Sequence, residues 1–514
     1  MAIFNLSEPP IPGPPIPDPP GSDPAGPSAP GPRPPRSPFP FKSALAIAVV
    51  AALLAAWHLK IDPRVGLDPA IFADALSLHW PTHPAPPIPV QPQIDTSKLP
   101  PTTPIFVDDS NNFDPFFAAL YKLEQGQANV VTILHYGDSP TTADLITGDI
   151  RAQMQARFGD AGRGYTLVAR PWAWYGHRGV EMSSSGWKVR TGVGLIREGI
   201  YGLGGAAFEG RPGAWSKFRI TGAAQSAVEV EYLARPDGGS FSISADGDQI
   251  AAQSTASDTQ SAAFLEAALP PGTRIISVQP SAGSVTLFGV DFRRGEKGLR
   301  YDSLGLNGAT TSVLARVMQP EIWKQELDHV APALIIVNYG SNESSFGKFV
   351  HTMYANELRL AIARIRRLAP HASILIMSPM DRGERTGLDE IQTMETIPEI
   401  VAIQRQVAAE AHCAFFDTYG AMGASGTMAR WYTASPRLVT ADLLHPTPQG
   451  ASIVAGLFLG QLSLRYDRWK MQHGIAVPAA PAPTTKHAPK STMAKVELNA
   501  PAASRRHGKK AGTR

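Results

Sequence analysis

The stretch Val-Val-Thr-Ile-Leu-His-Tyr-Gly-Asp-Ser, residues 130–139, carries the strongest indication of the fold. Its apolar and β-branched part, 130–136, predicts a buried strand. A Gly-Asp-Ser turn ends this strand, and apolar residues then recur at the four-residue spacing of a helix, at Ile146, Ile150 and Met154. The order strand, tight turn and helix is typical of α/β proteins.

The same alternation returns after residue 300. Strands are predicted over 301–306, 333–339, 373–377 and 414–416, and helices over 354–368 and 400–411. Alternating strands and helices predict a parallel sheet with helices on both faces. We therefore expect a doubly wound α/β domain.

Residues 165–297 follow a different pattern. Val228, Val230 and Tyr232 alternate with glutamates, and a Gly-Gly pair separates this run from a second alternating one. Short alternating runs joined by glycine turns, with little helical periodicity, predict a β-sandwich. We expect this sandwich to be inserted into the α/β domain, whose two parts would be residues 105–164 and 298–470.

The ends of the chain have the composition of non-globular segments. Residues 1–42 and 60–104 are rich in proline and are predicted to be a disordered segment and a linker. Residues 43–59 are almost entirely apolar and predict a transmembrane anchor, with a cleaved signal peptide or a buried soluble helix as the alternatives. Residues 471–514 are predicted to be a disordered basic tail.

Overall composition indicates no particular partner. The 514 residues carry a formal net charge of +3, which is small for this length. The basic tail could bind nucleic acid, but a solubilising disordered end is the interpretation we favour, and no nucleic-acid partner is expected. Cys413 is the single cysteine, so no intramolecular disulfide can form and cysteine usage does not identify the compartment.

Four short motifs occur in order along the predicted α/β part. They are Gly-Asp-Ser at 137–139, Asn-Gly-Ala-Thr at 307–310, Gly-Ser-Asn-Glu at 340–343 and Asp-Leu-Leu-His at 442–445. In a doubly wound sheet the loops beyond the carboxyl ends of the strands converge, so these motifs can meet in one crevice.

Together the motifs contain the groups that nucleophilic catalysis needs. A serine hydroxyl such as that of Ser139 requires a base, which His445 can supply, and Asp442 can hold the tautomer of that histidine. The tetrahedral intermediate carries a negative oxygen that needs hydrogen-bond donors. The backbone N–H groups of Ser139 and Gly308 and the amide of Asn342 are the candidates.

The four motifs resemble the four blocks of the SGNH/GDSL hydrolase superfamily. The stretches His135–Tyr165 and Tyr339–Glu343 look more closely like the bacterial cell-surface branch that acts on O-acetylated peptidoglycan and exopolysaccharides. Members of that branch often carry a carbohydrate-binding-like β-sandwich between the first and second blocks. Two positions depart from the pattern: Pro140 stands where relatives commonly have histidine, and Glu343 where many have aspartate.

This resemblance implies a flavodoxin-like α/β fold and a serine-dependent O-acetyl esterase acting on a cell-envelope or secreted polysaccharide, without a cofactor. From this resemblance together with the predicted anchor at residues 43–59, we expect a bacterial inner-membrane protein with a periplasmic catalytic domain. An O-acetyltransferase would use the same triad. The other alternative is a non-catalytic glycan-binding accessory protein of an exopolysaccharide machine, such as one that makes acetylated cellulose.

Four aromatic residues near the start of the predicted insert are candidates for sugar binding: Trp172, Trp174, Tyr175 and Trp187. Aromatic rings also fill the cores of sandwiches, so a sugar-stacking platform and a packing role stay open as alternatives. His135 is expected to pack or to support the site. The sequence contains no His, Cys, Asp or Glu cluster with the spacing of a metal site.

Overall fold

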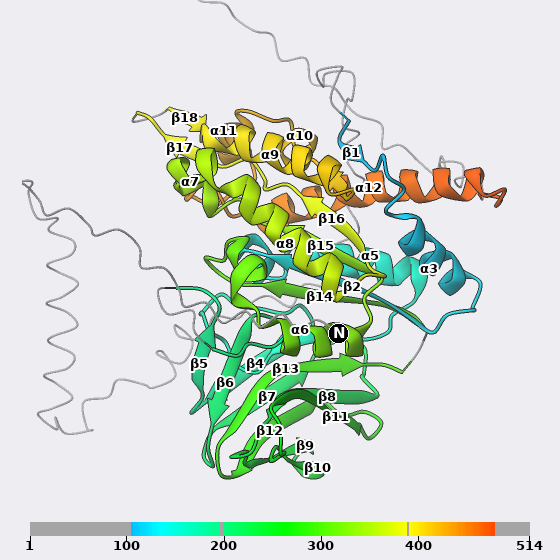
Figure 1. The fold of residues 1–514 in the computed structure, drawn as a ribbon, viewed down its shortest axis with the longest axis vertical. Helices are drawn as coiled ribbons and strands as arrows, with labels where there is room; N and C mark the ends of the chain where they lie inside the picture. Colours follow the sequence, from blue (N-terminus) through cyan, green and yellow to red (C-terminus); the bar gives the residue numbers. More distant parts are fainter. Residues whose placement is uncertain (1–103, 195–198, 296, 388–389, 478–514) are drawn as a thin grey trace, which may run out of the picture. The chain divides into compact units, whose positions relative to one another are not determined.

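The computed structural model describes residues 104–194, 199–295, 297–387 and 390–477 (Figure 1). The segments predicted as a disordered N-terminus, an anchor and a linker, residues 1–103, lie outside the described residues, as does the tail beyond residue 477. Within the described ranges, no helix has the length and apolar content needed to cross a membrane.

A six-stranded sheet forms the centre of the α/β part, with the strand order β1-β19-β16-β15-β2-β14. The strands are β1 Phe106–Val107, β2 Val130–Gly137, β14 Gly298–Gly305, β15 Leu334–Asn338, β16 Ser373–Met377 and β19 Ala414–Phe416. All neighbours pair in parallel except β1, which is antiparallel to β19. Taken in chain order, the parallel strands have the flavodoxin-like order 2-1-3-4-5, with a switch point between β2 and β15.

Helices cover both faces of this sheet because successive strand residues point to opposite faces. On β15, Leu334 and Ile336 belong to one hydrophobic cluster, while Ile335 and Val337 belong to another. The first cluster contains residues of α3 Asp114–Glu124, α5 Ile146–Phe158 and α12 Pro448–Gln472; the second contains residues of α6 Pro320–Val330, α8 Tyr354–Leu368 and α9 Thr396–Glu410. The predicted α/β sheet with helices on both faces is therefore confirmed.

The chain between β2 and β14 forms two further sheets, with the orders β10-β9-β12-β7-β4 and β11-β8-β13-β6-β5, and with β3 paired to β13 (Figure 1). Their strands are β3 Gly164–Leu167, β4 Val180–Ser185, β5 Lys188–Thr191, β6 Ala206–Gly210, β7 Trp215–Ile220, β8 Ala227–Ala234, β9 Ser240–Ala245, β10 Asp248–Ser254, β11 Ser261–Ala268, β12 Ile275–Ala282 and β13 Val285–Arg293. Aromatic rings from the two sheets pack against each other between the sheets. The ring centroids of Phe218 and Phe292 are 5.5 Å apart, and those of Tyr232 and Phe241 are 5.4 Å apart. This packing is that of a β-sandwich.

The sandwich and the central sheet share one continuous hydrophobic cluster. Polar contacts also join them: the Tyr165 backbone N–H donates to Asp302 Oδ1 at 3.0 Å, and His329 Nε2 on α6 lies 3.0 Å from Glu229 on β8. The junction is therefore part of the core, and the residue boundaries expected for the insert stay a prediction.

Three details differ from the expectations. Strand β1 was not predicted because two residues are too few to show an alternation. Helix α9 begins at Thr396 and not at residue 400, since Pro398 lies in the first helical turn, where its missing N–H costs no hydrogen bond. Helix α12 continues to Gln472, so the ordered chain extends into the segment expected as a tail.

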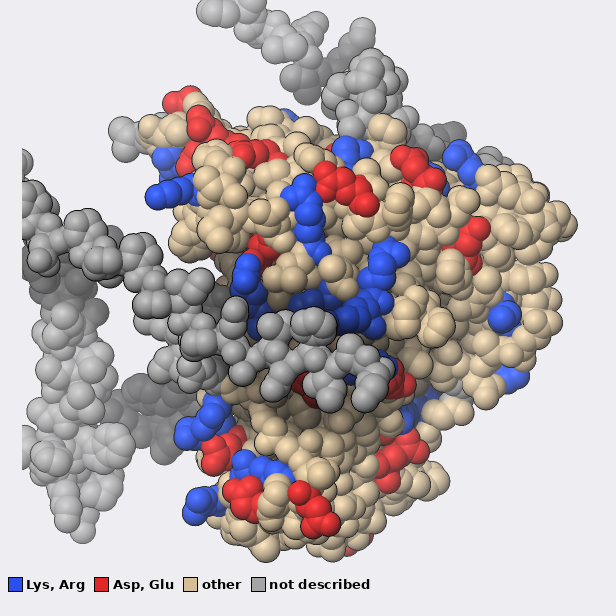
Figure 2. Space-filling model, in the orientation of Figure 1, with Lys and Arg blue, Asp and Glu red and all other residues tan. Residues whose placement is uncertain are grey.

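Charged side chains of both signs occur on the face drawn in Figure 2, where Lys and Arg gather across the middle and acidic residues are scattered around them. This mixture agrees with the small net charge of the sequence.

Candidate active site

The four motifs predicted to carry the chemistry lie at the carboxyl ends of the strands. Ser139 follows β2, Asn307 and Gly308 follow β14, and Asn342 follows β15. His445 lies in the loop that leads into α12. Since β2 and β15 flank the switch point, the motifs meet where open α/β sheets bind their ligands.

A chain of short hydrogen-bond distances joins the three predicted catalytic residues. His445 Nε2 lies 2.7 Å from Ser139 Oγ, and His445 Nδ1 lies 2.7 Å from Asp442 Oδ2. With Nδ1 protonated towards Asp442, Nε2 is free to accept the proton of the serine hydroxyl. Ser139 is buried, whereas His445 and Asp442 are partly exposed to solvent. The arrangement can activate a serine nucleophile.

Asp442 is held in place by hydrogen-bond donors that contact Oδ1, the carboxylate oxygen that does not bond the His445 ring. Asp442 Oδ1 accepts hydrogen bonds from Thr440 Oγ1 at 2.6 Å and from the backbone N–H groups of Leu444 and His445, both at 3.0 Å. Partial burial alone would raise the pKa of Asp442, but these hydrogen bonds and the one to the His445 ring lower it to about 2. The carboxylate therefore stays ionised and can stabilise an imidazolium at His445.

Two glycines allow the nucleophile segment to lie close to the ends of the strands. Ser139 begins a four-residue helix, α4 Ser139–Thr142, with Pro140 in its first turn. A Cβ at Gly137 would come within 2.2 Å of Thr141 Oγ1, and one at Gly305 within 2.3 Å of the Thr142 backbone nitrogen. Larger residues at these two positions would push α4, and Ser139 with it, away from the sheet.

The three predicted oxyanion donors, Ser139, Gly308 and Asn342, also lie beyond the carboxyl ends of the strands. Among the described residues, the backbone N–H groups of Ser139 and Gly308 have no hydrogen-bond acceptor within the chain. Gly308 has φ +76°, a conformation that glycine adopts without strain. Asn342 Nδ2 donates one of its hydrogens to Ala309 O at 2.8 Å. That bond orients the amide, and its second hydrogen is available to a ligand.

Glu343 is a contributor to the site that sequence reasoning did not identify. Its buried carboxylate accepts hydrogen bonds from Thr311 N at 2.7 Å, Thr311 Oγ1 at 2.8 Å and Gly340 N at 3.1 Å. It thereby ties the loop after β14 to the loop after β15, and burial raises its pKa. The departure from aspartate at this position was the one signal in the sequence, and it did not indicate a partner.

Arg382 also supports the third motif. Its Nη1, which has two hydrogens to donate, lies 2.6 Å from Ser341 O, 2.8 Å from Ser345 Oγ and 2.9 Å from Ser344 Oγ. Arg382 lies just before the short strand β17 Gly383–Arg385 and carried no motif that could have marked it.

The four predicted sugar-binding aromatics are not brought together as one platform. Tyr175 is buried, and its hydroxyl accepts a hydrogen bond from the Leu167 backbone N–H at 2.8 Å. Trp172 and Trp187 are partly buried and pack against the hydrophobic cluster. Trp174 alone is largely exposed, and its indole N–H donates to Asn307 Oδ1 in the second motif at 3.0 Å. The packing role therefore applies to three of them.

His135 is fully buried, with Nδ1 2.7 Å from Tyr301 Oη. Burial lowers its pKa to about 4, so it is neutral near pH 7. This agrees with the packing or supporting role expected for it.

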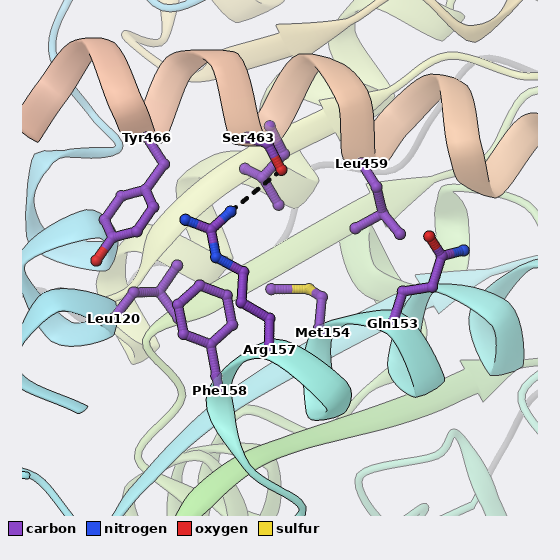
Figure 3. Close-up of a pocket in the computed structure, with 9 residues that line it drawn as sticks. Leu120, Gln153, Met154, Arg157, Phe158, Leu459, Ser463 and Tyr466 are labelled. Carbon is purple, nitrogen blue, oxygen red and sulfur yellow. Dashed lines mark hydrogen bonds between the residues drawn. The ribbon is translucent and has the colours of Figure 1, made fainter. Parts of the chain in front are cut away.

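A cavity of about 140 Å³ lies away from these motifs, between α5 and α12 (Figure 3). Its apolar lining includes Met154, Phe158 and Leu459, and Arg157 reaches across to Ser463. No residue of the Ser139, His445 and Asp442 set lines it.

Comparison with known proteins agrees with this geometry. Residues 273–453 match the GDSL-like Lipase/Acylhydrolase family, and this range includes Gly308, Asn342, Asp442 and His445. The chain contains a GDSL/SGNH hydrolase domain. It is therefore a serine ester hydrolase. Ser139 lies outside the matched range because the sandwich separates the first block of the SGNH domain from the other three.

Solved structures share this architecture. The chain resembles a solved structure described as a peptidoglycan O-acetylesterase in action, with a TM-score of 0.62 and 20% identity, over 71% of this chain and 100% of that one. This likeness shows a common fold. A salicylyl-acyltransferase from a tetracycline biosynthetic pathway matches at a TM-score of 0.26 and 14% identity, over 56% of this chain and 98% of that one. No curated protein matches the sequence.

Proposed function

We propose that this chain is an O-acetyl esterase that acts on a cell-envelope or secreted polysaccharide through Ser139, His445 and Asp442. The observation that carries the proposal is the pair of 2.7 Å distances that joins these residues at the switch point of the sheet. The free N–H groups of Ser139 and Gly308 beside them supply the donors that acyl transfer needs.

The reaction would proceed in two halves. His445 Nε2 takes the proton of Ser139 Oγ while the oxygen attacks the acetyl carbonyl, and the new oxyanion is bound by the donors of Ser139, Gly308 and Asn342. The C–O bond to the sugar then breaks, and His445 returns the proton to the departing sugar oxygen. Water, deprotonated by His445, attacks the acetyl-serine and releases acetate and free Ser139.

The choice of an acetylated glycan is supported by the likeness to the peptidoglycan O-acetylesterase. That chain is matched along its whole length, and the match covers 71% of this one. The sandwich inserted between the first two blocks is the kind of domain expected to contact a carbohydrate.

The decisive test compares Ser139→Ala with wild type for acetate release from O-acetylated peptidoglycan and O-acetylated cellulose oligomers. We expect turnover to be abolished by Ser139→Ala and kept by Ser463→Ala, a control serine on α12. Wild-type protein quenched early with an activated acetyl ester should carry one acetyl group on the peptide containing Ser139. Wild-type rates in Ser139→Ala would disprove the proposed role of this serine.

The same assay separates hydrolysis from transfer. An esterase forms acetate at a rate that an added acceptor sugar does not change. A transferase would instead form acetylated sugar faster than acetate, and that result would replace the esterase proposal with the acetyltransferase alternative.

We further propose that residues 43–59 tether the enzyme to a bacterial inner membrane with the SGNH domain in the periplasm, where other members of a polysaccharide machine would be its partners. The support is the apolar run and the proline-rich linker that follows it. Reporter fusions after Lys60 should be active only in an exported compartment. Cytoplasmic activity of such fusions would contradict the tether.

A further inference from the structure

Trp174 differs from the other described tryptophans in its exposure. Its relative exposure is 56%, whereas Trp172 and Trp187 pack partly into the core. A single exposed apolar side chain is common on protein surfaces and needs no special explanation. Trp174, however, is hydrogen-bonded to the loop after β14, and its own segment is hydrogen-bonded to the segment that follows Ser139.

The first observation is its contact with the oxyanion-hole loop. The Trp174 indole N–H donates to Asn307 Oδ1 at 3.0 Å, and Asn307 immediately precedes Gly308. This hydrogen bond fixes one edge of the ring beside the second motif. The relative exposure of 56% leaves much of the Trp174 side chain open to solvent.

The second observation is that the segment around Trp174 is bonded to the nucleophile segment. Gly176 N donates to Thr142 O at 3.2 Å, and Arg178 N donates to Asp144 Oδ2 at 2.7 Å. Asp144 is itself buried and accepts a hydrogen bond from Arg151 Nη1 at 3.1 Å. The position of Trp174 is therefore coupled on one side to the loop after β14 and on the other to the helix that begins with Ser139.

We propose that Trp174 is a substrate-contacting specificity residue, whose exposed ring face stacks on the pyranose ring that bears the acetyl ester. This proposal rests on the proposed glycan esterase function and names one of its sugar subsites. The flat face of a pyranose presents polarised C–H groups, which complement the negative face of an indole. A ring held at its edge and open on its face can receive a sugar without reorganising.

The test uses the full-length chain and two acetyl esters that differ in the presence of a sugar ring. The substrates are methyl 6-O-acetyl-β-D-glucopyranoside and vinyl acetate, and acetate release gives kcat and KM for each. The variants are Trp174→Ala and Trp174→Phe, which keeps an aromatic face. Trp215→Ala is the matched control, because Trp215 is a partly exposed tryptophan of the sandwich whose ring contacts Lys217.

Trp174→Ala should lower kcat/KM for the pyranoside about tenfold, mainly through KM, and leave vinyl acetate within about twofold. Trp174→Phe should keep most of the pyranoside activity, and Trp215→Ala all of it. An equal loss on both substrates would assign Trp174 to positioning Gly308 and overturn the proposal, as would no loss on either. If wild type hydrolyses vinyl acetate but not the sugar ester, the glycan function itself fails, and the subsite with it.

Discussion

Carboxylates at the active site and carboxylates in the junction between the central sheet and the sandwich differ in their exposure to solvent. At the active site, Asp442 has a side-chain exposure of 51%, and four hydrogen bonds hold it. Its pKa of about 2 keeps it charged. In the junction, Glu229 and Asp291 are buried, and both are paired with Arg293.

The junction also contains carboxyl groups without a countercharge at hydrogen-bond distance. Among the described residues, both carboxylate oxygens of Glu326 and Oε2 of Glu231 are buried without a hydrogen-bond partner. Burial raises the pKa of both groups well above the usual range, and the nearby Glu326 raises the pKa of Glu231 further. The charged carboxylate of the triad, Asp442, is thus exposed to solvent. The buried carboxyl groups between the sandwich and the central sheet are either paired with an arginine or neutral.

This contrast predicts two classes of variant. Variants of exposed groups at the active site, such as Asp442, should change the rate and leave the free energy of unfolding nearly unchanged, because these groups are solvated. Variants in the junction should change the free energy of unfolding, since an unpaired buried charge is costly.

The largest effect is expected for Asp442→Asn, which keeps the shape of the side chain but can no longer hold the tautomer of His445. We expect kcat to fall on the order of 10⁴-fold, with the urea midpoint unchanged. Asp467→Asn on α12 is the matched control and should keep the wild-type rate. A loss below about tenfold would mean that Asp442 does not orient the base.

Asn342→Ala should be the next most severe active-site variant. It removes one oxyanion donor and should lower kcat roughly 100- to 1000-fold with little change in KM. The exposed Asn356→Ala on α8 serves as control. Because Asn342 also bonds Ala309 O, circular dichroism melting must accompany the kinetics. A fall in the melting temperature as large as that of a core variant would assign Asn342 a structural role.

Arg293→Ala tests the junction. Its Nε donates to Asp291 Oδ2 at 2.8 Å, its Nη1 to Glu266 at 2.6 Å, and its Nη2 to Glu229. Removing it should lower the unfolding free energy by about 3 kcal/mol, measured in urea, while kcat of the folded enzyme stays close to wild type.

The control for this variant is Arg219→Ala, which breaks an exposed pair with Glu181 in the same sandwich, where the atoms are 3.6 Å apart. A cost below about 0.5 kcal/mol is expected for it. If both arginine variants lowered the unfolding free energy by the same amount, pairing of the buried charges in the junction would not stabilise the fold.

A last effect concerns the pH dependence of stability at Asp138. Burial, followed by the charge of Glu343, raises the pKa of Asp138 to about 7. The folded chain then holds this proton more tightly than the unfolded chain, so its contribution to stability falls as pH rises from about 4 to about 7. Asp138→Asn should flatten that part of the curve by up to about 1.4 kcal/mol per pH unit. An unchanged slope would show that Asp138 is ionised throughout.

Local sequence patterns were sufficient for several of the regular elements of the α/β part. The predicted helix over 354–368 and strand over 373–377 coincide with α8 and β16, because their periodicity depends on residues a few positions apart. The order of the four motifs also indicated a serine, a histidine and an aspartate for one site. Each of these inferences used short stretches whose chemistry is visible without knowledge of distant contacts.

Only the tertiary structure decided what depends on contacts between distant residues. Phe106 pairs with Phe416 across the sheet, Glu343 bonds Thr311, and Trp174 bonds Asn307, and none of these pairs shares a local pattern. The sequence presented the four aromatics of the insert as equivalent, although three of them pack and one is exposed beside Gly308. Their roles differ because burial is a property of the assembled surfaces, which the order of residues along one stretch does not contain.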